Sequence, residues 1–514
     1  MNCYKSATRS KIPLHPKREN LFSCNFSLKS VVYCFGDKCS ATTMKPNFQL
    51  CLVTVIAIFA HMDGKCQTKP IALHPVNPHY FIYNEKPTVL ITSGEHYGAV
   101  LNLDFDYQKY LVELQTKGLN LTRTFTGAYV EPAGAFNITE NTLAPSTDKF
   151  ICPWPRSQEP GYAGGGNKFD LEHWNDAYFL RLKDFVAAAE KKGVIVELAL
   201  FCPFYEKIQW NISPMNGSNN INGVGNIGKD SVYTLDKSGG LLMVHEALVR
   251  KVVRELKGYS NIIYEICNEP YFGGVTMEWQ HHIASLISAT EKELGIKHLI
   301  SQNIANDSAK ITNPHPDVSV FNFHYASPPT AVKQNYGLKK VIGNNETGFR
   351  GQKDSTYRKE GWQILLSGGA LYNNLDYSFT ASHEDGNYAY PEKQPGGGSA
   401  LLRNQLGFLM KFMNDLDFVR MKPDKSFFAG PLSGQTRVYS LSETGKQYAA
   451  YFLRGQQINP TLRLPAGKYS ISWMDPVTGA YSKKETLQHK GGDVVVASPQ
   501  FDFDIALRIV KDRK

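Results

Sequence analysis

Cysteines are scarce after the first 66 residues of the sequence. Six of the nine cysteines fall at or before Cys66, which leaves Cys152, Cys202 and Cys267 in the rest of the chain. Three cysteines form no disulfide framework, and their separations of 50 and 65 residues match no compact zinc-binding pattern. The sequence therefore predicts neither a disulfide-stabilised scaffold nor a structural metal site.

Excess positive charge is also scarce in the main part of the chain. The formal net charge is +9, but residues 1–66 contain nine Lys or Arg against three Asp or Glu, which leaves about +3 for the remainder. No stripe of Lys and Arg interleaved with aromatic residues follows residue 70, so the electrostatic pattern of a nucleic-acid-binding surface is missing. We expect no nucleic-acid partner.

The apolar run of residues 50–60 is too short to span a membrane, and it follows a short basic start at Lys45. We interpret residues 44–67 as a signal peptide that begins at Met44, and we expect a secreted or periplasmic protein without a membrane span. Residues 1–43 are interpreted as an upstream extension outside the mature protein, and a genuine long leader is the alternative.

Residues 75–415 alternate short β-branched runs with amphipathic helical segments, a pattern typical of βαβ units and a parallel sheet. Eight strands are expected, which favours a closed (β/α)8 TIM barrel over an open sheet. They are Thr88–Ser93, Leu119–Phe125, Val194–Phe201, Asn261–Cys267, His298–Ile304, Val318–His324, Lys340–Glu346 and Ala370–Phe379.

Two helices of this barrel are visible in the spacing of apolar residues. One apolar face runs from Trp174 to Ala189 and is followed by Gly193, and a second runs from Leu241 to Leu256 and is followed by Gly258. Glycine commonly follows the last turn of a helix, so both segments are predicted to end there.

Two connections, of residues 126–168 and 202–238, are longer than a barrel needs, and such loops commonly build active sites. Trp154, Trp210 and Tyr205 in these loops are candidate sugar-stacking residues, and the alternative is that they pin the loops onto the barrel.

From Met421 the pattern changes to short alternating strands, expected at Thr436–Leu441, Gln447–Phe452, Tyr469–Trp473 and Asp493–Ala497. We predict a small all-β sandwich domain over residues 421–514. Its Trp473-Met474-Asp475-Pro476-Val477-Thr478-Gly479 segment is similar to a turn in C-terminal domains of bacterial barrel glycosidases, which favours an accessory role that braces the barrel.

The strand Asn261–Cys267 ends in Asn268-Glu269-Pro270. A proline cannot continue a strand ladder, so Glu269 is expected where the strand gives way to a loop. This ending of a fourth barrel strand resembles the acid/base motif of glycoside hydrolase clan A, the superfamily that contains cellulases, mannanases and many β-glycosidases. The resemblance covers about 340 residues of the chain.

The resemblance implies that Glu269 is the acid/base and that a second glutamate, at the end of the seventh strand, is the nucleophile. Glu346 occupies that position, 77 residues after Glu269. The common form of the motif has glycine directly before the nucleophile, whereas this sequence has Asn344 and Asn345 there. A surface glutamate is the alternative for Glu346.

By the same resemblance, Arg123 would hold the nucleophile ionised and oriented, and Asn268 would bond the sugar 2-hydroxyl. His324 and Tyr325 end the sixth strand, where clan members place a His and a Tyr. Adjacent residues of a strand point to opposite faces, so both would reach the site only if a bulge intervened. We favour His324 and leave Tyr325 open.

The eighth predicted strand lacks the tryptophan that often closes a clan A sugar site, and Tyr377 or Phe379 are possible substitutes. Asp376 is a candidate for binding a sugar hydroxyl, with a salt bridge at the barrel rim as the alternative. His96 and its neighbour Tyr97 follow the first strand and are further candidates for substrate binding, although an isolated histidine is often structural.

These features predict a retaining glycoside hydrolase that cleaves β-glycosidic bonds of a poly- or oligosaccharide by double displacement, without a cofactor or a metal. The alternatives are a non-catalytic carbohydrate-binding protein on the same barrel and a transglycosylase. A Ser/His hydrolase is disfavoured because the chain has no Gly-x-Ser-x-Gly elbow.

Overall fold

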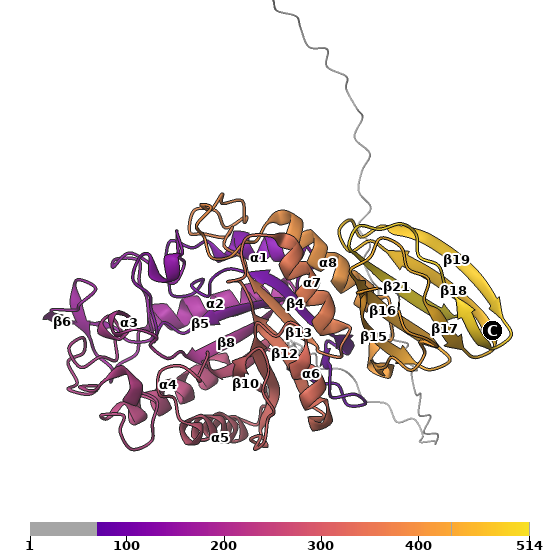
Figure 1. Cartoon of the computed structure of the whole chain (residues 1–514). Helices are drawn as coiled ribbons and strands as arrows, with labels where there is room; N and C mark the ends of the chain where they lie inside the picture. Colours follow the sequence, from indigo (N-terminus) through magenta and orange to yellow (C-terminus); the bar gives the residue numbers. More distant parts are fainter. Residues whose placement is uncertain (1–68, 433, 513–514) are drawn as a thin grey trace, which may run out of the picture. The chain divides into compact units, whose positions relative to one another are not determined.

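A computed structural model describes residues 69–432 and 434–512 (Figure 1), and the predicted upstream extension and signal peptide lie outside these ranges. The predicted barrel is confirmed by eight parallel strands in one sheet. They are β4 (Leu90–Gly94), β5 (Leu121–Phe125), β8 (Ile195–Phe201), β9 (Ile262–Cys267), β10 (Leu299–Asn306), β11 (Val318–His324), β12 (Val341–Glu346) and β13 (Leu371–Leu375).

The ladder of this sheet runs β4-β13-β12-β11-β10-β9-β8-β5, so the two end strands are β4 and β5. Asn120, just before β5, joins them. Its backbone N–H donates to the carbonyl of Ile91 at 3.3 Å, and its side-chain oxygen accepts from the N–H of Ile91 at 3.0 Å. The side-chain amide also donates to the carbonyl of Val89 at 2.8 Å. Asn120 therefore supplies three of the hydrogen bonds that close the barrel, and the backbone N–H of Phe125 adds another to the carbonyl of Tyr97 at 3.0 Å.

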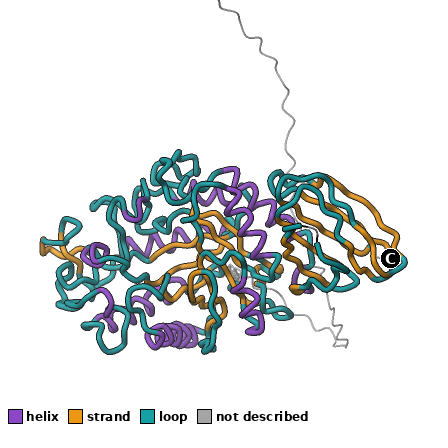
Figure 2. The backbone as a smooth tube through the Cα atoms, viewed as in Figure 1, coloured by secondary structure: helices purple, strands orange, loops and turns teal. Residues whose placement is uncertain are grey.

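Figure 2 shows helices around the barrel strands. The longer ones are α1 (Tyr107–Thr116), α2 (Asp176–Lys191), α4 (Leu241–Leu256), α5 (Met277–Leu294), α7 (Asp354–Leu365) and α8 (Ala400–Asn414), with the short α3 (Lys207–Asn211) and α6 (Thr330–Asn335). The two helices predicted from apolar spacing are α2 and α4. Unlike the other consecutive barrel strands, β10 and β11 are joined by a loop without a helix. None of the helices described is long and apolar enough to cross a membrane.

A three-stranded antiparallel sheet that the sequence did not predict precedes the barrel. It comprises β1 (Ala72–Leu73), β2 (Phe81–Tyr83) and β3 (Lys86–Thr88). The predicted first strand merged the end of β3 with β4. The backbone N–H of Ile71 bonds the carbonyl of Ser260 at 2.8 Å, and the hydroxyls of Tyr83 and Ser260 lie 3.1 Å apart. Because Ser260 precedes β9, this sheet lies at the end of the barrel where the strands begin.

The C-terminal part is built from strands and loops, as predicted. A six-stranded sheet has the order β14-β15-β16-β21-β18-β19, and β17 pairs with β20. The bounds are β14 (Lys422–Pro423), β15 (Arg437–Glu443), β16 (Gln447–Leu453), β17 (Thr461–Leu464), β18 (Gly467–Met474), β19 (Tyr481–His489), β20 (Gly492–Val495) and β21 (Asp504–Lys511). The long loops after β5 and β8 contain β6 (Arg156–Pro160), β7 (Asn167–Phe169) and α3.

Strand β16 is buried on both faces. Tyr448, Ala450 and Phe452 belong to the core of the C-terminal domain itself, whereas Ala449 and Tyr451 belong to the larger core that includes the barrel. Tyr451 stacks on Trp362 of α7, with ring centroids 5.3 Å apart. The domain thus packs one face of its main sheet against the barrel, consistent with a bracing role.

A buried ion pair crosses the same contact. Arg358 of α7 donates to both carboxylate oxygens of Asp504 in β21, at 2.7 and 3.2 Å, and the hydroxyl of Tyr451 donates to Asp504 at 2.7 Å. Asp504 is fully buried and Arg358 almost so. Charges removed from water need such partners, so the pair depends on both parts of the chain being in place.

We predict that Asp504→Asn destabilises the protein by about 3 kcal/mol, because it leaves the Arg358 guanidinium buried without a counter-charge. Urea-induced unfolding measures this change. Asp493→Asn is the matched control, since Asp493 pairs with Arg463 on the exposed surface of the same domain and should leave the transition unchanged. Equal shifts for the two variants would contradict a contribution from the buried pair.

Candidate active site

The carboxyl ends of four barrel strands bring together the residues that the sequence singled out. Arg123 lies in β5, Glu269 follows β9, His324 ends β11 and Glu346 ends β12. All four side chains are at least nine-tenths buried. Side chains from neighbouring strand ends and from the two long loops enclose a cavity of about 310 Å³, which is lined by both glutamates.

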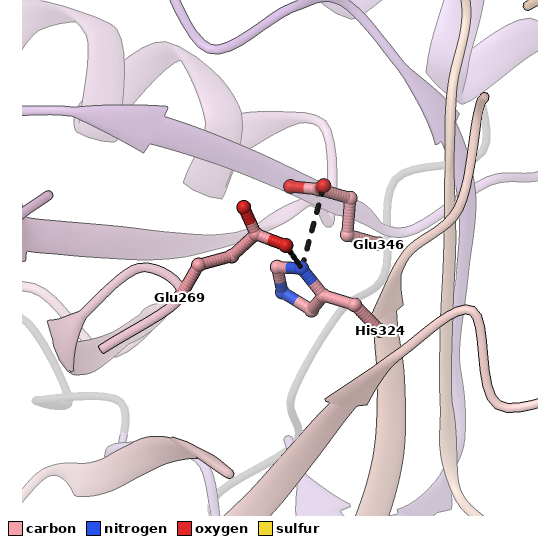
Figure 3. A group of neighbouring side chains, drawn as sticks. All are labelled: Glu269, His324 and Glu346. Atoms are coloured by element: carbon pink, nitrogen blue, oxygen red, sulfur yellow. Dashed lines mark hydrogen bonds and ion pairs between the residues drawn. The ribbon is translucent and has the colours of Figure 1, made fainter. Parts of the chain in front are cut away.

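His324 lies between the two glutamates (Figure 3). Its Nδ1 is 3.0 Å from Oε1 of Glu269 and 3.3 Å from Oε1 of Glu346. One oxygen of each glutamate and the imidazole nitrogen all lie within 4.8 Å of one another. The two carboxyl groups therefore face each other across a short gap.

Three hydrogen-bond donors and one ion pair hold Glu346. The hydroxyl of Tyr97 donates to Oε2 at 2.8 Å, Nη1 of Arg123 to the same oxygen at 3.2 Å, and the hydroxyl of Tyr325 to Oε1 at 3.2 Å. The ion pair joins Nδ1 of His324 to Oε1 of Glu346 at 3.3 Å, while the hydrogen bond of that nitrogen goes to Glu269. Donors of this kind stabilise the ionised carboxylate and fix its orientation.

Electrostatics favours an anionic Glu346 beside a cationic His324. Burial alone raises the pKa of Glu346, but His324, Arg123 and the Tyr97 hydroxyl outweigh it and lower the pKa to about 2. Burial lowers the pKa of His324, but Glu346 and Glu269 outweigh it and raise the pKa to about 9. At neutral pH the cluster therefore contains a carboxylate and an imidazolium.

This protonation state bears on metal binding. Glu269, His324 and Glu346 are close enough to share an ion, and no other such group is found among the residues that the structure describes. A histidine must lose its proton from the coordinating nitrogen, and a pKa of about 9 keeps His324 protonated at neutral pH. The cluster is therefore better suited to hydrogen bonding than to holding a metal.

Glu269 has a different set of neighbours. The hydroxyl of Tyr205 donates to Oε2 at 2.6 Å, and the hydroxyl of Tyr271 lies 3.0 Å from Oε1 and 2.6 Å from Oδ1 of Asn306. No Arg or Lys bonds this carboxyl group in the described chain. Its backbone has φ of +35°, a conformation that L-residues adopt with strain and that recurs at functional sites.

Both His324 and Tyr325 reach the site, although adjacent strand residues normally point to opposite faces. The β11/β12 register shifts between Phe323 and His324, and Tyr325 has φ of +53°. The irregularity and the left-handed residue redirect the second side chain, as a bulge does. The sequence does not decide whether Tyr325 reaches the site, because neither the register shift nor the left-handed backbone is visible in residue spacing.

Arg123 makes more contacts than the sequence indicated. Its Nε and Nη2 donate to the two oxygens of Glu265 at 2.6 Å each, and Nη2 also donates to Oδ1 of Asn268 at 2.6 Å. Glu265 was not among the predicted site residues. A glutamate in the middle of a buried strand needs a cation, so the pattern Tyr264-Glu265-Ile266 was the available signal.

The asparagine before Glu346 has a role below the cavity. Nδ2 of Asn345 donates to Glu265 and to Glu197 of β8, at 3.2 Å each, and Glu197 also accepts from Asn322 at 2.7 Å. Burial and the neighbouring Glu265 raise the pKa of Glu197 to about 7. Asn345 thus supplies amide hydrogens to two buried acids, which a glycine at this position could not do.

Asp376, Trp154 and Trp210, three of the four predicted candidates that lie apart from the cavity, have structural contacts instead. Asp376 corresponds to the salt-bridge alternative, because Oδ2 accepts from Arg403 at 2.7 Å and from Ser93 at 2.9 Å. Trp154 and Trp210 are buried and do not line the cavity, so they pin the loops. Of the three loop aromatics proposed for stacking, Tyr205 alone faces the cavity.

Other candidates line or support the cavity wall. His96 and Asn268 line it directly, together with Tyr97 and Tyr325. Tyr377 is buried behind the wall, with its ring 5.7 Å from that of His96 and 6.0 Å from that of Phe349. Phe379 packs instead under Arg403, away from the cavity. Glu131, which sequence reasoning missed, also lines the wall.

The chain resembles known proteins both in sequence and in fold. A model of the cellulase family, glycosyl hydrolase family 5, matches residues 107–374. No curated protein matches the sequence.

Three solved structures share the fold. A Bacteroides vulgatus protein proposed to be a glycoside hydrolase has a TM-score of 0.62 at 13% identity, covering 87% of this chain and 83% of its own. A protein described as a glycoside hydrolase has a TM-score of 0.60 at 15% identity, covering 87% of this chain and 98% of its own. A family 5 glycoside hydrolase from Bacteroides vulgatus has a TM-score of 0.58 at 13% identity, covering 86% of this chain and 94% of its own. The similarity therefore extends beyond the barrel into the C-terminal domain.

We predict that the stability lost in His324→Gln depends on pH. A histidine whose pKa rises from 6.5 to about 9 on folding stabilises the protein fully below pH 6.5, and this contribution disappears as the pH rises through 9. The difference in unfolding free energy between wild type and variant should therefore narrow over that interval, as measured by urea unfolding at a series of pH values.

His245→Gln is the control, because His245 is buried without an acidic partner and burial lowers its pKa to about 3. Its side chain is uncharged in both folded and unfolded states at alkaline pH, so its stability difference should stay constant between about pH 7 and pH 10. Parallel pH profiles for the two variants would contradict a cationic His324.

Proposed function

We propose that this chain, which belongs to the cellulase family, glycosyl hydrolase family 5, hydrolyses β-glycosidic bonds of a poly- or oligosaccharide with retention of anomeric configuration. Glu346 is the nucleophile and Glu269 the acid/base. Membership of the family supports glycoside hydrolysis in general, and the stereochemistry and the two roles are argued from the site.

The separation of the two carboxyl groups carries this proposal. Retaining enzymes hold them about 5–5.5 Å apart, so that one can attack the sugar directly, whereas inverting enzymes leave about 6.5–9.5 Å for a water molecule. An oxygen of Glu269 and an oxygen of Glu346 lie within 4.8 Å of each other. This short separation fits direct attack by one carboxylate better than the wider gap that an inverting enzyme leaves for a water molecule.

The different surroundings of the glutamates support the assignment of roles. A nucleophile must be ionised, and the low pKa of Glu346 follows from its imidazolium, guanidinium and hydroxyl neighbours. An acid must carry a proton when the substrate binds. No Arg or Lys bonds Glu269 in the described chain, and it stands in the Asn268-Glu269-Pro270 sequence that resembles the acid/base motif, so the role of the acid is assigned to it.

In the first step Glu346 attacks the anomeric carbon, the glycosidic C–O bond breaks, and Glu269 transfers its proton to the departing oxygen. The sugar is then an ester of Glu346. In the second step Glu269 takes a proton from water, the water oxygen attacks the anomeric carbon, and the ester bond breaks to restore both carboxyl groups. Arg123 and Tyr97 keep the nucleophile oriented throughout.

The proposal extends to the place of action. The apolar run of residues 50–60 after Lys45 supports a signal peptide from Met44 and a secreted or periplasmic enzyme. Such a location suits an enzyme whose substrate is a polysaccharide outside the cell.

We expect Glu346→Ala to abolish hydrolysis of aryl β-glycosides and polysaccharides, and Glu269→Ala to lower kcat by about 10²- to 10⁴-fold on substrates with poor leaving groups. NMR of the first product formed should show retained configuration. Azide should restore part of the Glu269→Ala activity by forming a β-glycosyl azide, because azide attacks the glycosyl-enzyme without a general base.

Glu172→Ala removes an exposed glutamate and should behave as wild type. An inverted first product would refute the double displacement, and carbohydrate binding without turnover by wild type would favour the non-catalytic alternative.

A further inference from the structure

Eight aromatic side chains at the cavity form a closed series of ring contacts, here called the aromatic collar. Its members are His96, Tyr97, Phe125, Tyr129, Tyr205, Phe136, Phe349 and Tyr377. Each ring contacts the next at centroid distances between 4.9 and 6.3 Å, and Tyr377 contacts His96 again. All except Tyr377 line the cavity. A saccharide chain that extended through this series of rings would need a gap between two of them.

Glu131 contributes a fixed carboxylate to the wall. It is 5% exposed, its Oε1 accepts from the hydroxyl of Tyr129 at 2.9 Å, and its Oε2 accepts from the amide of Asn141 at 2.5 Å. Its backbone N–H bonds the carbonyl of Leu143 at 2.9 Å. A carboxylate has about four acceptor positions, so these two bonds leave capacity for donors in the cavity.

His96 supplies hydrogen-bonding groups that the described protein leaves unused. The side chain is more than nine-tenths buried, yet neither Nδ1 nor Nε2 has a hydrogen-bond partner. Nε2 is 3.6 Å from Oε2 of Glu131, which is longer than a hydrogen bond. Because His96 lines the cavity, its nitrogens have hydrogen-bonding capacity left for a ligand that binds there. A sugar hydroxyl can donate to Glu131 and accept from His96 at once.

The position of the pair identifies which part of the substrate it contacts. His96 stacks on Tyr97, and the hydroxyl of Tyr97 donates to Glu346. The sugar that becomes attached to Glu346 is the one on the non-reducing side of the cleaved bond. Glu131 and His96 therefore adjoin that sugar, while Tyr271 and Asn306 adjoin the leaving-group side at Glu269.

The charges of the cavity restrict the sugar further. No Lys or Arg lines it, and its acidic side chains are Glu131, Glu269 and Glu346. Arg123 lies behind the wall with its charge taken up by Glu265 and Glu346. A uronic acid would place a carboxylate among these groups without a cation to pair with, which is costly in a water-poor site.

We propose that Glu131 and His96 form a binding site for hydroxyl groups of the non-reducing terminal sugar of a neutral β-linked saccharide, so that the enzyme releases single sugars from chain ends. This inference rests on the proposed function and adds the mode of action and the sugar class.

The first test compares an aryl β-glycoside that the wild type hydrolyses with its 3-, 4- and 6-deoxy analogues. Loss of a hydrogen bond to a charged group lowers kcat/KM about 10- to 100-fold, so at least one analogue should be that much poorer for wild type. In Glu131→Gln and His96→Phe, kcat/KM for the parent substrate should fall to the value for that analogue. The ratio of kcat/KM for the parent substrate to kcat/KM for the analogue should therefore approach one.

The choice of variants keeps this test informative. His96→Phe preserves the ring stacked between Tyr97 and Tyr377 and removes only the two nitrogens, so it tests the pair even if Glu131→Gln disturbs the contacts to Asn141. Glu140→Gln alters an exposed glutamate of the same connection and should retain the wild-type ratio. If both Glu131→Gln and His96→Phe kept the wild-type ratio of kcat/KM for the parent and deoxy substrates, the proposed site would be overturned.

The second test uses a neutral tetrasaccharide with a reduced reducing end, alone and with its terminal sugar capped by a 4,6-benzylidene group. Release of single sugars from the free form and no cleavage of the capped form are expected, as is no hydrolysis of an aryl β-glucuronide. Equal cleavage of both tetrasaccharides with retained configuration would overturn this inference and leave the proposed function standing. No turnover of any substrate would overturn both.

Discussion

The ion pairs of Arg123 organise the whole site. A fully buried guanidinium is tolerated only with counter-charges, and Glu265 takes two of its hydrogen bonds while Glu346 and Asn268 take the others. Because Glu265 already compensates the cation, the charge of Glu346 is left to a second cation, His324. The cations Arg123 and His324 then face the carboxyl groups of Glu265 and Glu346. This arrangement keeps Glu346 ionised without the water that would normally solvate it.

The backbone meets the geometric demands of this arrangement with local strain. Tyr97, Glu269 and Tyr325 follow three different barrel strands, and each has a positive φ that costs roughly 1–3 kcal/mol. The conformations turn side chains at the ends of strands into the cavity, where hydrogen bonds to the two glutamates hold them. The chemistry thus rests on rigid strand ends, whereas the loops after β5 and β8 add Tyr129, Glu131, Phe136, Leu143, Cys202 and Tyr205 to the cavity wall.

The barrel and the strand-end residues were accessible from the sequence, because buried parallel strands are continuous β-branched runs and because Glu269 and Arg123 are charged residues at the ends or in the middle of such runs. The loop residues were only partly accessible, since Tyr205 was a candidate together with Trp154 and Trp210 and the others were missed. Glu131, Tyr205 and Tyr271 act through contacts with residues far away in the sequence, and no local pattern distinguishes them from Trp154 and Trp210, which are structural. Nor does spacing reveal the register shift that brings Tyr325 beside His324.

The most direct test of the account is to treat the protein with a 2-deoxy-2-fluoro-β-glycosyl fluoride and to locate the attached sugar by mass spectrometry of peptides. The fluorine slows both steps, and the good leaving group allows the first to proceed, so the glycosyl-enzyme accumulates. The account predicts one sugar per molecule, on the peptide that contains Glu346. A sugar on Glu269 or on any other residue, or turnover of ordinary substrates without any labelling, would contradict it.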